Sequence, residues 1–132
     1  MIKFRYRKEF SIISGTVLRP VADVTLEANN RTVEVVMYID SGADITMISL
    51  EVGKALDLKQ NPDDEILEIK GVSGSGVPYI LKKANIILNG KKLKIRLAWA
   101  LIEEVPLLLG RMDIFPKFKI TFDEKQDSIF FI

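Results

Sequence analysis

The chain has 132 residues, of which 48% are hydrophobic and 28% are charged, and its formal net charge is +1. It contains no histidine and no cysteine, which excludes a Ser-His-Asp or Cys-His nucleophile, a disulfide framework and a zinc site of nitrogen and sulfur ligands. The small net charge gives no electrostatic reason to expect a nucleic-acid or anionic-membrane partner. We expect residues 1–132 to form a single domain whose chemistry uses carboxylates, hydroxyls, lysines and the backbone.

No segment has the pattern of a signal peptide or a membrane span. The first ten residues carry charges throughout, whereas a signal peptide needs an uninterrupted apolar region. The most apolar window, residues 97–109, is interrupted by Glu103, Glu104 and Pro106, and it is shorter than the ~20 residues that span a bilayer. We therefore expect a cytoplasmic protein without a membrane partner.

Alternation of apolar and polar side chains with a period of two predicts strands that bury one face. A first strand is predicted at residues 4–12, with Phe4, Tyr6, Phe10 and Ile12 on its buried face. Asn29 and Asn30 separate two further alternating segments, and Asn89-Gly90 is a strong two-residue hairpin signal. The fold class is therefore mainly β and antiparallel. The strands of the two hairpins are predicted at residues 22–28 and 33–39, and at 86–88 and 93–99.

One or two short helices are expected between the strands. Ser49 is a suitable N-cap for a helix over residues 50–57, and a second turn is expected after Gly110. Residues 128–132 form an apolar, β-prone run, which would aggregate if its edge were left in solvent. We expect this run to be paired and covered, either by the same chain or by another subunit.

The most informative residues are Asp40-Ser41-Gly42-Ala43. They follow the apolar run 35–39, so the carboxylate of Asp40 lies where a buried strand ends and the backbone turns. A small hydroxyl residue and a glycine directly behind it leave this carboxylate accessible, as a catalytic aspartate must be. Because Asp, Ser and Gly are also common turn residues, an ordinary turn is the alternative interpretation.

An ordered set of segments from residue 19 onward resembles the retroviral-type (retropepsin-like) aspartic proteases. That family has a D-[ST]-G-A-D loop, a glycine-rich flap and a later apolar-apolar-Gly-Arg signature. A single D-S-G is common by chance, but the set in this order is specific. The matching segments are Arg19-Pro20, Asp40-Ser41-Gly42-Ala43-Asp44, the flap residues Gly71, Val72, Ser73, Gly74, Ser75 and Gly76, and Leu108-Leu109-Gly110-Arg111.

The resemblance implies a closed retropepsin-like β-barrel with a β-hairpin flap. It also implies an aspartic endopeptidase that hydrolyses peptide or protein substrates without a metal or cofactor. Such an enzyme needs two carboxylates across one water, one ionised and one protonated. The sequence carries one such motif, because Asp113 and Asp123 lack the following Ser-Gly or Thr-Gly. The second carboxylate is then expected from Asp40 of a second copy, on the axis of a homodimer.

The residues after Asp40 take roles by analogy with the family. Ser41 would hydrogen-bond across the axis to the opposing loop. Gly42 would let the backbone come close enough to donate to a carboxylate. Ala43 cannot donate the hydrogen bond that a hydroxyl residue gives in pepsin-like enzymes, so we expect a pH optimum less acidic than theirs.

Asp44 and Arg111 are expected to form a structural ion pair, which in the family ties the active-site loop to the C-terminal helix. Arg19 is expected to join this pair from the other subunit. The sequence departs from the family at Met112, where many relatives have Asp or Asn directly after Gly-Arg. Here the acid comes one residue later, as Asp113, which leaves that part of the network open.

Two other functions also fit the sequence. The first is a catalytically inactive retropepsin-like module for dimerisation or peptide binding, since a fold does not fix a function. The second is an unrelated small β-barrel that binds ligands or partners as a monomer. Residues 1–18 match the family least. They form an N-terminal extension or strand, which would act as a dimer-forming strand, a cover for the flap or a removable leader.

Overall fold

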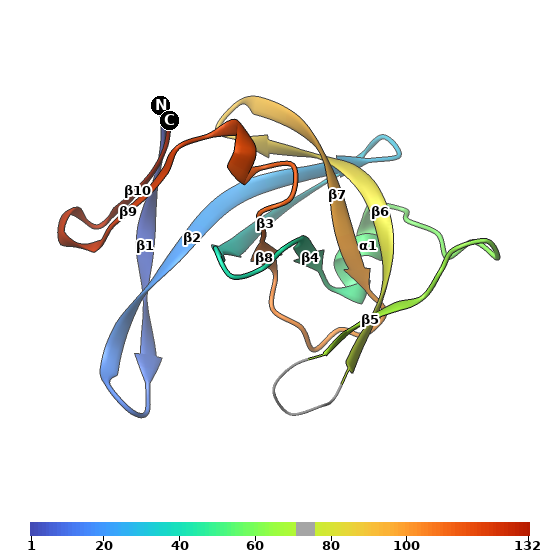
Figure 1. Ribbon diagram of the computed structural model, residues 1–132, viewed down its shortest axis with the longest axis horizontal. Helices are drawn as coiled ribbons and strands as arrows, with labels where there is room; N and C mark the ends of the chain where they lie inside the picture. Colours follow the sequence, from blue (N-terminus) through green and yellow to red (C-terminus); the bar gives the residue numbers. More distant parts are fainter. Residues whose placement is uncertain (71–75) are drawn as a thin grey trace.

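The alternating segments pair as β-strands, and polar turns connect them (Figure 1). This computed structural model describes residues 1–70 and 76–132. Within them the fold is mainly β, as the alternation predicted. The strands are β1 (Ile2–Ser11), β2 (Gly15–Ala28), β3 (Arg31–Ile39), β4 (Thr46–Ile48), β5 (Leu67–Lys70), β6 (Gly76–Leu88), β7 (Lys91–Ala100), β8 (Leu108–Leu109), β9 (Ile120–Asp123) and β10 (Ser128–Phe131).

A ring of strands makes the body of the molecule. Strand β2 pairs with β3 along one edge and with β6 along the other, and the ring continues from β6 through β7, β4 and β8 back to β3. The hairpins predicted at Asn29-Asn30 and Asn89-Gly90 are confirmed, since they join β2 to β3 and β6 to β7. All four turn residues have positive φ angles, between 47° and 87°, as tight hairpin turns require.

The inward faces of the ring strands form the core. Leu26 of β2, Met37 of β3 and Leu97 of β7 are completely buried, and each such side chain contributes about 1.5–3 kcal/mol of hydrophobic free energy. Ile39 continues the buried row of β3 with 3% of its surface exposed. The chain therefore leaves the core at the next residue, Asp40.

The predicted helix after Ser49 is present as α1 (Leu50–Ala55). The Ser49 hydroxyl caps it by accepting a hydrogen bond of 3.4 Å from the Val52 backbone N–H. The helix ends before the predicted residue 57 because Asp57 adopts a left-handed backbone with φ of 56°. Two single 3₁₀ turns, η1 (Phe115–Lys117) and η2 (Glu124–Gln126), follow Gly110 in the chain.

The apolar C-terminal run is paired and covered within its own chain. Strand β10 lies between β1 and β9, and Ile129 and Phe131 are buried. The ring of Phe131 meets the edges of Phe4 and Phe118 at centroid distances of 5.3 and 5.4 Å, a favourable aromatic geometry. Another subunit is therefore not required to cover this strand.

The first strand, β1, has two halves with different surroundings. Residues 2–5 pair with β10, whereas residues 6–11 pair with the first residues of β2 and leave the body as a hairpin (Figure 1). Tyr6 is buried as predicted, but Phe10 is 81% exposed and Ile12 94% exposed. The expectation that these two residues share a buried face is wrong, because no second layer covers the projecting part of the hairpin.

Candidate active site

Asp40 directly follows β3 and is anchored by the parallel strand β8. The backbone N–H of Tyr38 donates to the carbonyl of Leu107 at 2.9 Å, and that of Asp40 donates to the carbonyl of Leu109 at 3.0 Å. Parallel pairing of Ile39 with Leu109 continues this contact. The position of Asp40 is thus fixed by a segment that lies far along the chain.

The loop after Asp40 folds back onto its carboxylate. The backbone N–H of Gly42 donates to Asp40 Oδ1 at 2.9 Å, and that of Ala43 donates to the Asp40 carbonyl at 3.1 Å. Asp40 is half-buried, whereas Ser41 and Gly42 are exposed. One carboxylate oxygen is thereby oriented by the backbone while the loop remains open to a ligand or a second chain.

The segment after β8 interlocks with this loop. Gly110 donates its N–H to the buried Thr46 Oγ1 at 3.1 Å. The N–H groups of Arg111 and Met112 donate to the carbonyls of Ala43 and Asp44, both at 2.9 Å. The structure thus brings together the Asp-Ser-Gly-Ala-Asp segment and the apolar-apolar-Gly-Arg segment, which the sequence resemblance had matched separately.

The expected ion pair between Asp44 and Arg111 is not formed in this chain. The Arg111 guanidinium instead reaches the carbonyl of Ser41 at 3.5 Å and lies over the ring of Phe115 at 5.4 Å from its centroid. The link between the two segments is made by the backbone bonds described above, which need no side-chain charge. Arg111 still contacts the loop, but through a carbonyl oxygen rather than a carboxylate.

A hollow of about 530 Å³ opens beside the Asp40 carboxylate. Two of its lining residues, Asp40 and Ser41, were predicted from the sequence. Phe122 and Glu124 were not, because nothing in their spacing indicates that β9 and the turn η2 after it lie beside Asp40. The hollow is lined by Tyr6, Pro20, Ile39, Asp40, Ser41, Phe122 and Glu124.

Solved structures of known proteases share the fold of this chain. No protein-family model matches the sequence, and a search of curated proteins finds no match. Among solved structures, the EIAV protease complexed with the inhibitor HBY-793 is 26% identical with a TM-score of 0.53, and the match covers 70% of this chain and 82% of the viral chain. A retropepsin-like aspartic protease from Rickettsia conorii is 18% identical with a TM-score of 0.62, and the match covers 96% of this chain and 98% of the other.

The chain has the retropepsin fold. The resemblance found in the sequence is thereby confirmed. In this retropepsin-like chain the predicted flap segment lies mostly outside the described residues, since only Gly76 of residues 71–76 is described. The strands that flank the segment, β5 and β6, pair antiparallel from Leu67 with Tyr79 to Lys70 with Gly76.

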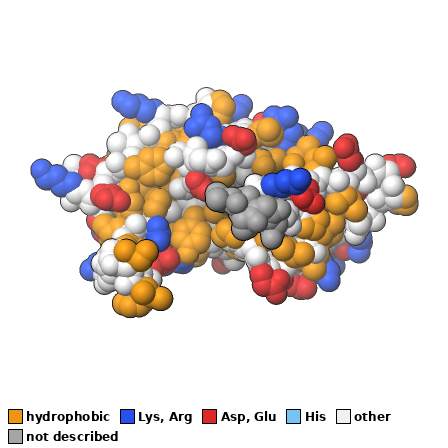
Figure 2. All heavy atoms as spheres, turned by 60° about the horizontal axis from the view of Figure 1, so that its bottom comes forward, with side chains coloured by type: hydrophobic (Ala, Val, Ile, Leu, Met, Phe, Trp, Pro, Cys, Tyr) orange, Lys and Arg blue, Asp and Glu red, His pale blue; other side chains and the backbone are white. Residues whose placement is uncertain are grey.

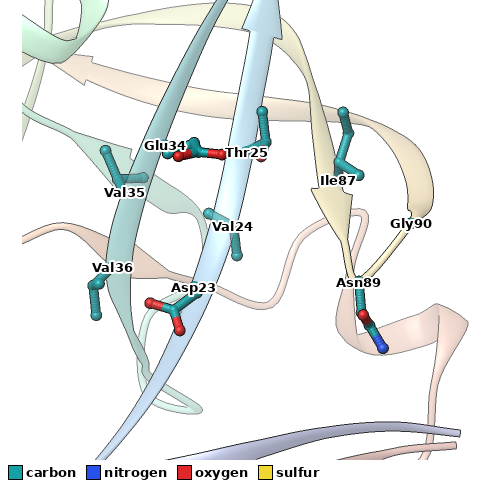
Figure 3. A pocket seen from close by; sticks show the side chains of 9 residues that line it. All are labelled: Asp23, Val24, Thr25, Glu34, Val35, Val36, Ile87, Asn89 and Gly90. Atoms are coloured by element: carbon teal, nitrogen blue, oxygen red, sulfur yellow. The ribbon is translucent and has the colours of Figure 1, made fainter.

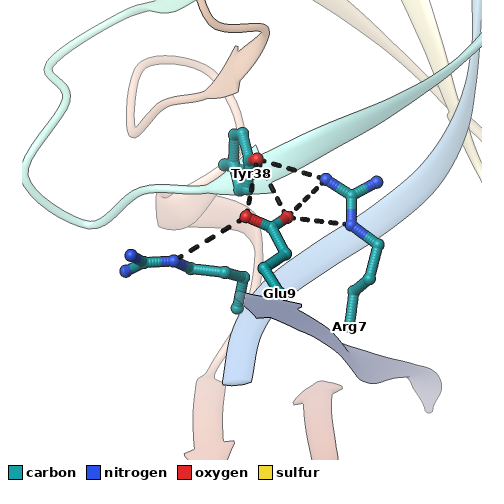
Figure 4. Close-up of polar contacts among 4 residues, drawn as sticks. Arg7, Glu9 and Tyr38 are labelled. Carbon is teal, nitrogen blue, oxygen red and sulfur yellow. Dashed lines mark hydrogen bonds and ion pairs between the residues drawn. The ribbon is translucent and has the colours of Figure 1, made fainter. Parts of the chain in front are cut away.

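Arg7, Glu9 and Tyr38 form a polar cluster in this retropepsin-like fold (Figure 4), and Tyr38 is two residues before Asp40 in the sequence. Glu9 accepts two hydrogen bonds from Arg7, at 2.6 and 2.9 Å, and one of 2.9 Å from the Tyr38 hydroxyl. These bonds, from Arg7 first and Tyr38 second, hold the pKa of Glu9 below its ordinary value. Arg19, which was expected to cross to another subunit, approaches Glu9 at 3.9 Å in its own chain.

A second hollow, of about 440 Å³, lies along β2, β3 and the turn between β6 and β7 (Figure 3). Its lining includes the carboxylates of Asp23 and Glu34 but none of the residues matched to the retropepsin-like family.

Within residues 1–70 and 76–132, no group of three carboxylates is placed to hold a metal ion. No helix in the described part of the chain is long and apolar enough to cross a membrane.

Asp113, the acid displaced by one residue relative to the family, binds Arg96 of β7. Its carboxylate accepts bonds of 3.0 and 2.9 Å from the Arg96 guanidinium and one of 2.8 Å from the Arg96 backbone N–H. The side-chain bonds and the backbone bond from Arg96 lower the pKa of Asp113 to about 2. The acid thus ties the turn after Met112 to the ring rather than to the Asp40 loop.

Replacing Asp113 by Asn is expected to destabilise the fold by about 1–2 kcal/mol at neutral pH. Asn tolerates the left-handed backbone at this position, where φ is 66°. The loss of unfolding free energy therefore measures the contribution of the carboxylate charge. Because the folded-state pKa is depressed from 3.8 to about 2, the stabilisation is present above pH ~4 and is lost as the pH falls toward 2. Urea unfolding of both proteins at several pH values measures this, and a difference that stays constant down to pH ~2 contradicts it.

Proposed function

We propose that this protein is an aspartic endopeptidase that acts as a homodimer, with water activated between two Asp40 carboxylates. The observation that carries the proposal is the position of Asp40 in a retropepsin fold. Its backbone is anchored by Leu109, one of its carboxylate oxygens is oriented by the Gly42 N–H at 2.9 Å, and its side chain borders an open hollow. Such pre-organisation is what general acid–base catalysis requires.

The second carboxylate is assigned to a second copy because the other aspartates considered from the sequence are engaged elsewhere. Asp113 is held by Arg96. Asp123 accepts a hydrogen bond of 3.1 Å from the Gln126 N–H and caps η2. A two-fold axis next to Asp40 would bring two identical loops together, with Ser41 of each copy placed to bond across the axis.

The chemistry follows from two carboxylates that share one proton. Two negative charges at hydrogen-bonding distance cannot both persist, so one member of the pair is ionised and the other is protonated. The ionised member takes a proton from the bound water as that water attacks the peptide carbonyl, and the protonated member donates to the carbonyl oxygen. The tetrahedral diol then collapses: the newly protonated carboxyl gives its proton to the amide nitrogen as the C–N bond breaks, and the other carboxylate takes a proton back from a diol hydroxyl, which regenerates the pair.

The substrate is an extended peptide that lies between the two subunits. An extended strand is recognised mainly through main-chain hydrogen bonds, and residues 71–76 of both copies are the proposed flaps over it. Ala43 has no hydroxyl group to donate a hydrogen bond to the ionised aspartate, so we place the pH optimum above that of pepsin-like enzymes.

Cleavage of a peptide library by the purified protein tests this function. Hydrolysis that is blocked by a statine-type inhibitor, with a rate that declines below pH ~3, is the expected result, since pepsin's lower pKa is about 1.5. A rate that still rises below pH ~3 contradicts the role of Ala43. Absence of cleavage in a protein that is dimeric in solution favours the inactive dimerisation or peptide-binding module.

A further inference from the structure

The hairpin formed by residues 6–20 projects from the body of the molecule, and we call it the arm. Its strands pair with each other from Tyr6 with Pro20 to Ser11 with Gly15. Near its tip, Phe10, Ile12 and Ile13 are 81%, 94% and 97% exposed. Figure 1 shows the arm extending past the ring toward the bottom of the view, and Figure 2 shows apolar side chains gathered on a projection of the face that this side of the molecule presents.

Such a tip is unusual on a surface that meets only water. Single exposed apolar residues are common, but a cluster of large apolar side chains marks an interaction site. These three side chains contribute no hydrophobic free energy to the folded monomer, because they do not contact its core. We therefore infer that they are exposed in the isolated chain and covered when another surface binds.

The base of the arm is held rigidly near the candidate site. Arg7 and Glu9 lie on its first strand, and Glu9 accepts a hydrogen bond from the hydroxyl of Tyr38, two residues before Asp40 (Figure 4). Arg7 also lies over the Tyr38 ring, 5.4 Å from its centroid. The direction of the arm is thus set by the same strand that sets the position of Asp40.

The arm and the candidate site also share one surface. Tyr6 and Pro20, at the base of the arm, line the hollow that Asp40 and Ser41 line. Two copies that bring their Asp40 carboxylates to hydrogen-bonding distance must place these two hollows against each other. The arm then starts at the edge of that contact, because its base residues Tyr6 and Pro20 belong to the hollow.

We propose that the arm docks on a second copy of this chain and that Phe10, Ile12 and Ile13 are buried against it. This inference rests on the proposed function, which requires the second copy. By symmetry each arm reaches the other molecule, so the contact occurs twice in the dimer. The arm is therefore an interface element that adds to the contact made by the Asp40 loops.

The double variant Ile12→Ser/Ile13→Ser tests the proposal, with Ile132→Ser as the matched control. Ile132 is 60% exposed and lies at the C-terminus, at the opposite end of the molecule from the arm tip (Figure 1). All these side chains are exposed, so the folded monomer should keep its unfolding midpoint. Sedimentation equilibrium should show a dimer dissociation constant about tenfold or more above that of the wild type for the double variant, and an unchanged one for the control.

Peptide cleavage measured against protein concentration separates the possible outcomes. The expected result is a loss of activity at low concentration that is recovered, with unchanged kcat, once the double variant is dimeric.

An unchanged dissociation constant overturns the role of the arm while leaving the proposed function intact. A raised KM in fully dimeric protein also overturns the role of the arm in dimerisation and favours a contact between the arm and the substrate. A wild type that is monomeric at every concentration overturns both the arm contact and the homodimer. A dimer weakened by the double variant but unable to cleave peptides supports the arm and contradicts the enzyme.

Discussion

Replacing Asp40 by Asn is expected to reduce the proposed peptide hydrolysis by about 10³-fold or more while leaving the fold and the proposed dimer intact. The amide keeps the size of the carboxylate, and its oxygen can still accept the hydrogen bond that Gly42 donates to Oδ1 at 2.9 Å. It cannot take a proton from water, and general acid–base catalysis is worth about 10²–10⁴-fold for each such group. Initial rates on a cleaved peptide, with Asp63→Asn as a surface control, measure the effect.

Mixing the Asp40→Asn chain with the wild type shows where the second carboxylate comes from. If both carboxylates are copies of Asp40, an equal mixture at exchange equilibrium should retain about one quarter of the activity, because only dimers of two wild-type chains work. A value of about one half would mean that each chain carries its own pair. In that case Glu124, the other carboxylate that lines the hollow with Asp40, would be the second acid, and the symmetric dyad would be rejected.

Replacing Gly110 by Ala is expected to destabilise the protein by about 3–5 kcal/mol or to prevent folding. A Cβ atom at this position would overlap the carbonyl carbon and oxygen of Ile45 and lie 2.8 Å from the Thr46 backbone nitrogen. These are backbone atoms, so neither segment can move without losing the bond from Gly110 to Thr46. Urea unfolding measures the loss.

The Gly90→Ala variant is the control for Gly110, because it separates steric overlap from backbone strain. Gly90 has a φ of +87° and nothing within 4 Å of its Cβ position. Its replacement should cost only about 1 kcal/mol, the strain of a left-handed alanine. Equal losses for the two variants would show that the contact between the loops is looser than the structure indicates.

The local parts of the fold were predictable because they depend on neighbouring residues. Asn29-Asn30 and Asn89-Gly90 favour the positive φ angles of their turns, and the Ser49 hydroxyl satisfies a free N–H of α1. The exit of the chain from the core at Asp40 follows in the same way from the alternation along β3. The resemblance to the retropepsin-like family then supplied the two segments that meet there.

The rest could not be predicted, because it depends on contacts between distant segments. The alternation that correctly buries Tyr6 continues through Phe10 and Ile12, although the chain there has left the body and the side chains are exposed. Nothing near Arg111 in the sequence indicates that its guanidinium prefers the Ser41 carbonyl and the Phe115 ring to Asp44. The return of Phe122 and Glu124 to the hollow follows from how β9 and β10 pair, which no local pattern specifies.

The Asp40 loop and the segment that binds it lie far apart in the sequence, and this separation determines when the loop can form during synthesis. Ser41 and Arg111, which meet in the folded protein, are 70 residues apart in the chain. A ribosome that adds about 5–20 residues per second needs roughly 4–14 seconds to make that stretch. Throughout this interval the Asp40 loop of a nascent chain lacks the backbone bonds from Arg111 and Met112, so the loop reaches its final arrangement only after synthesis has passed residue 112.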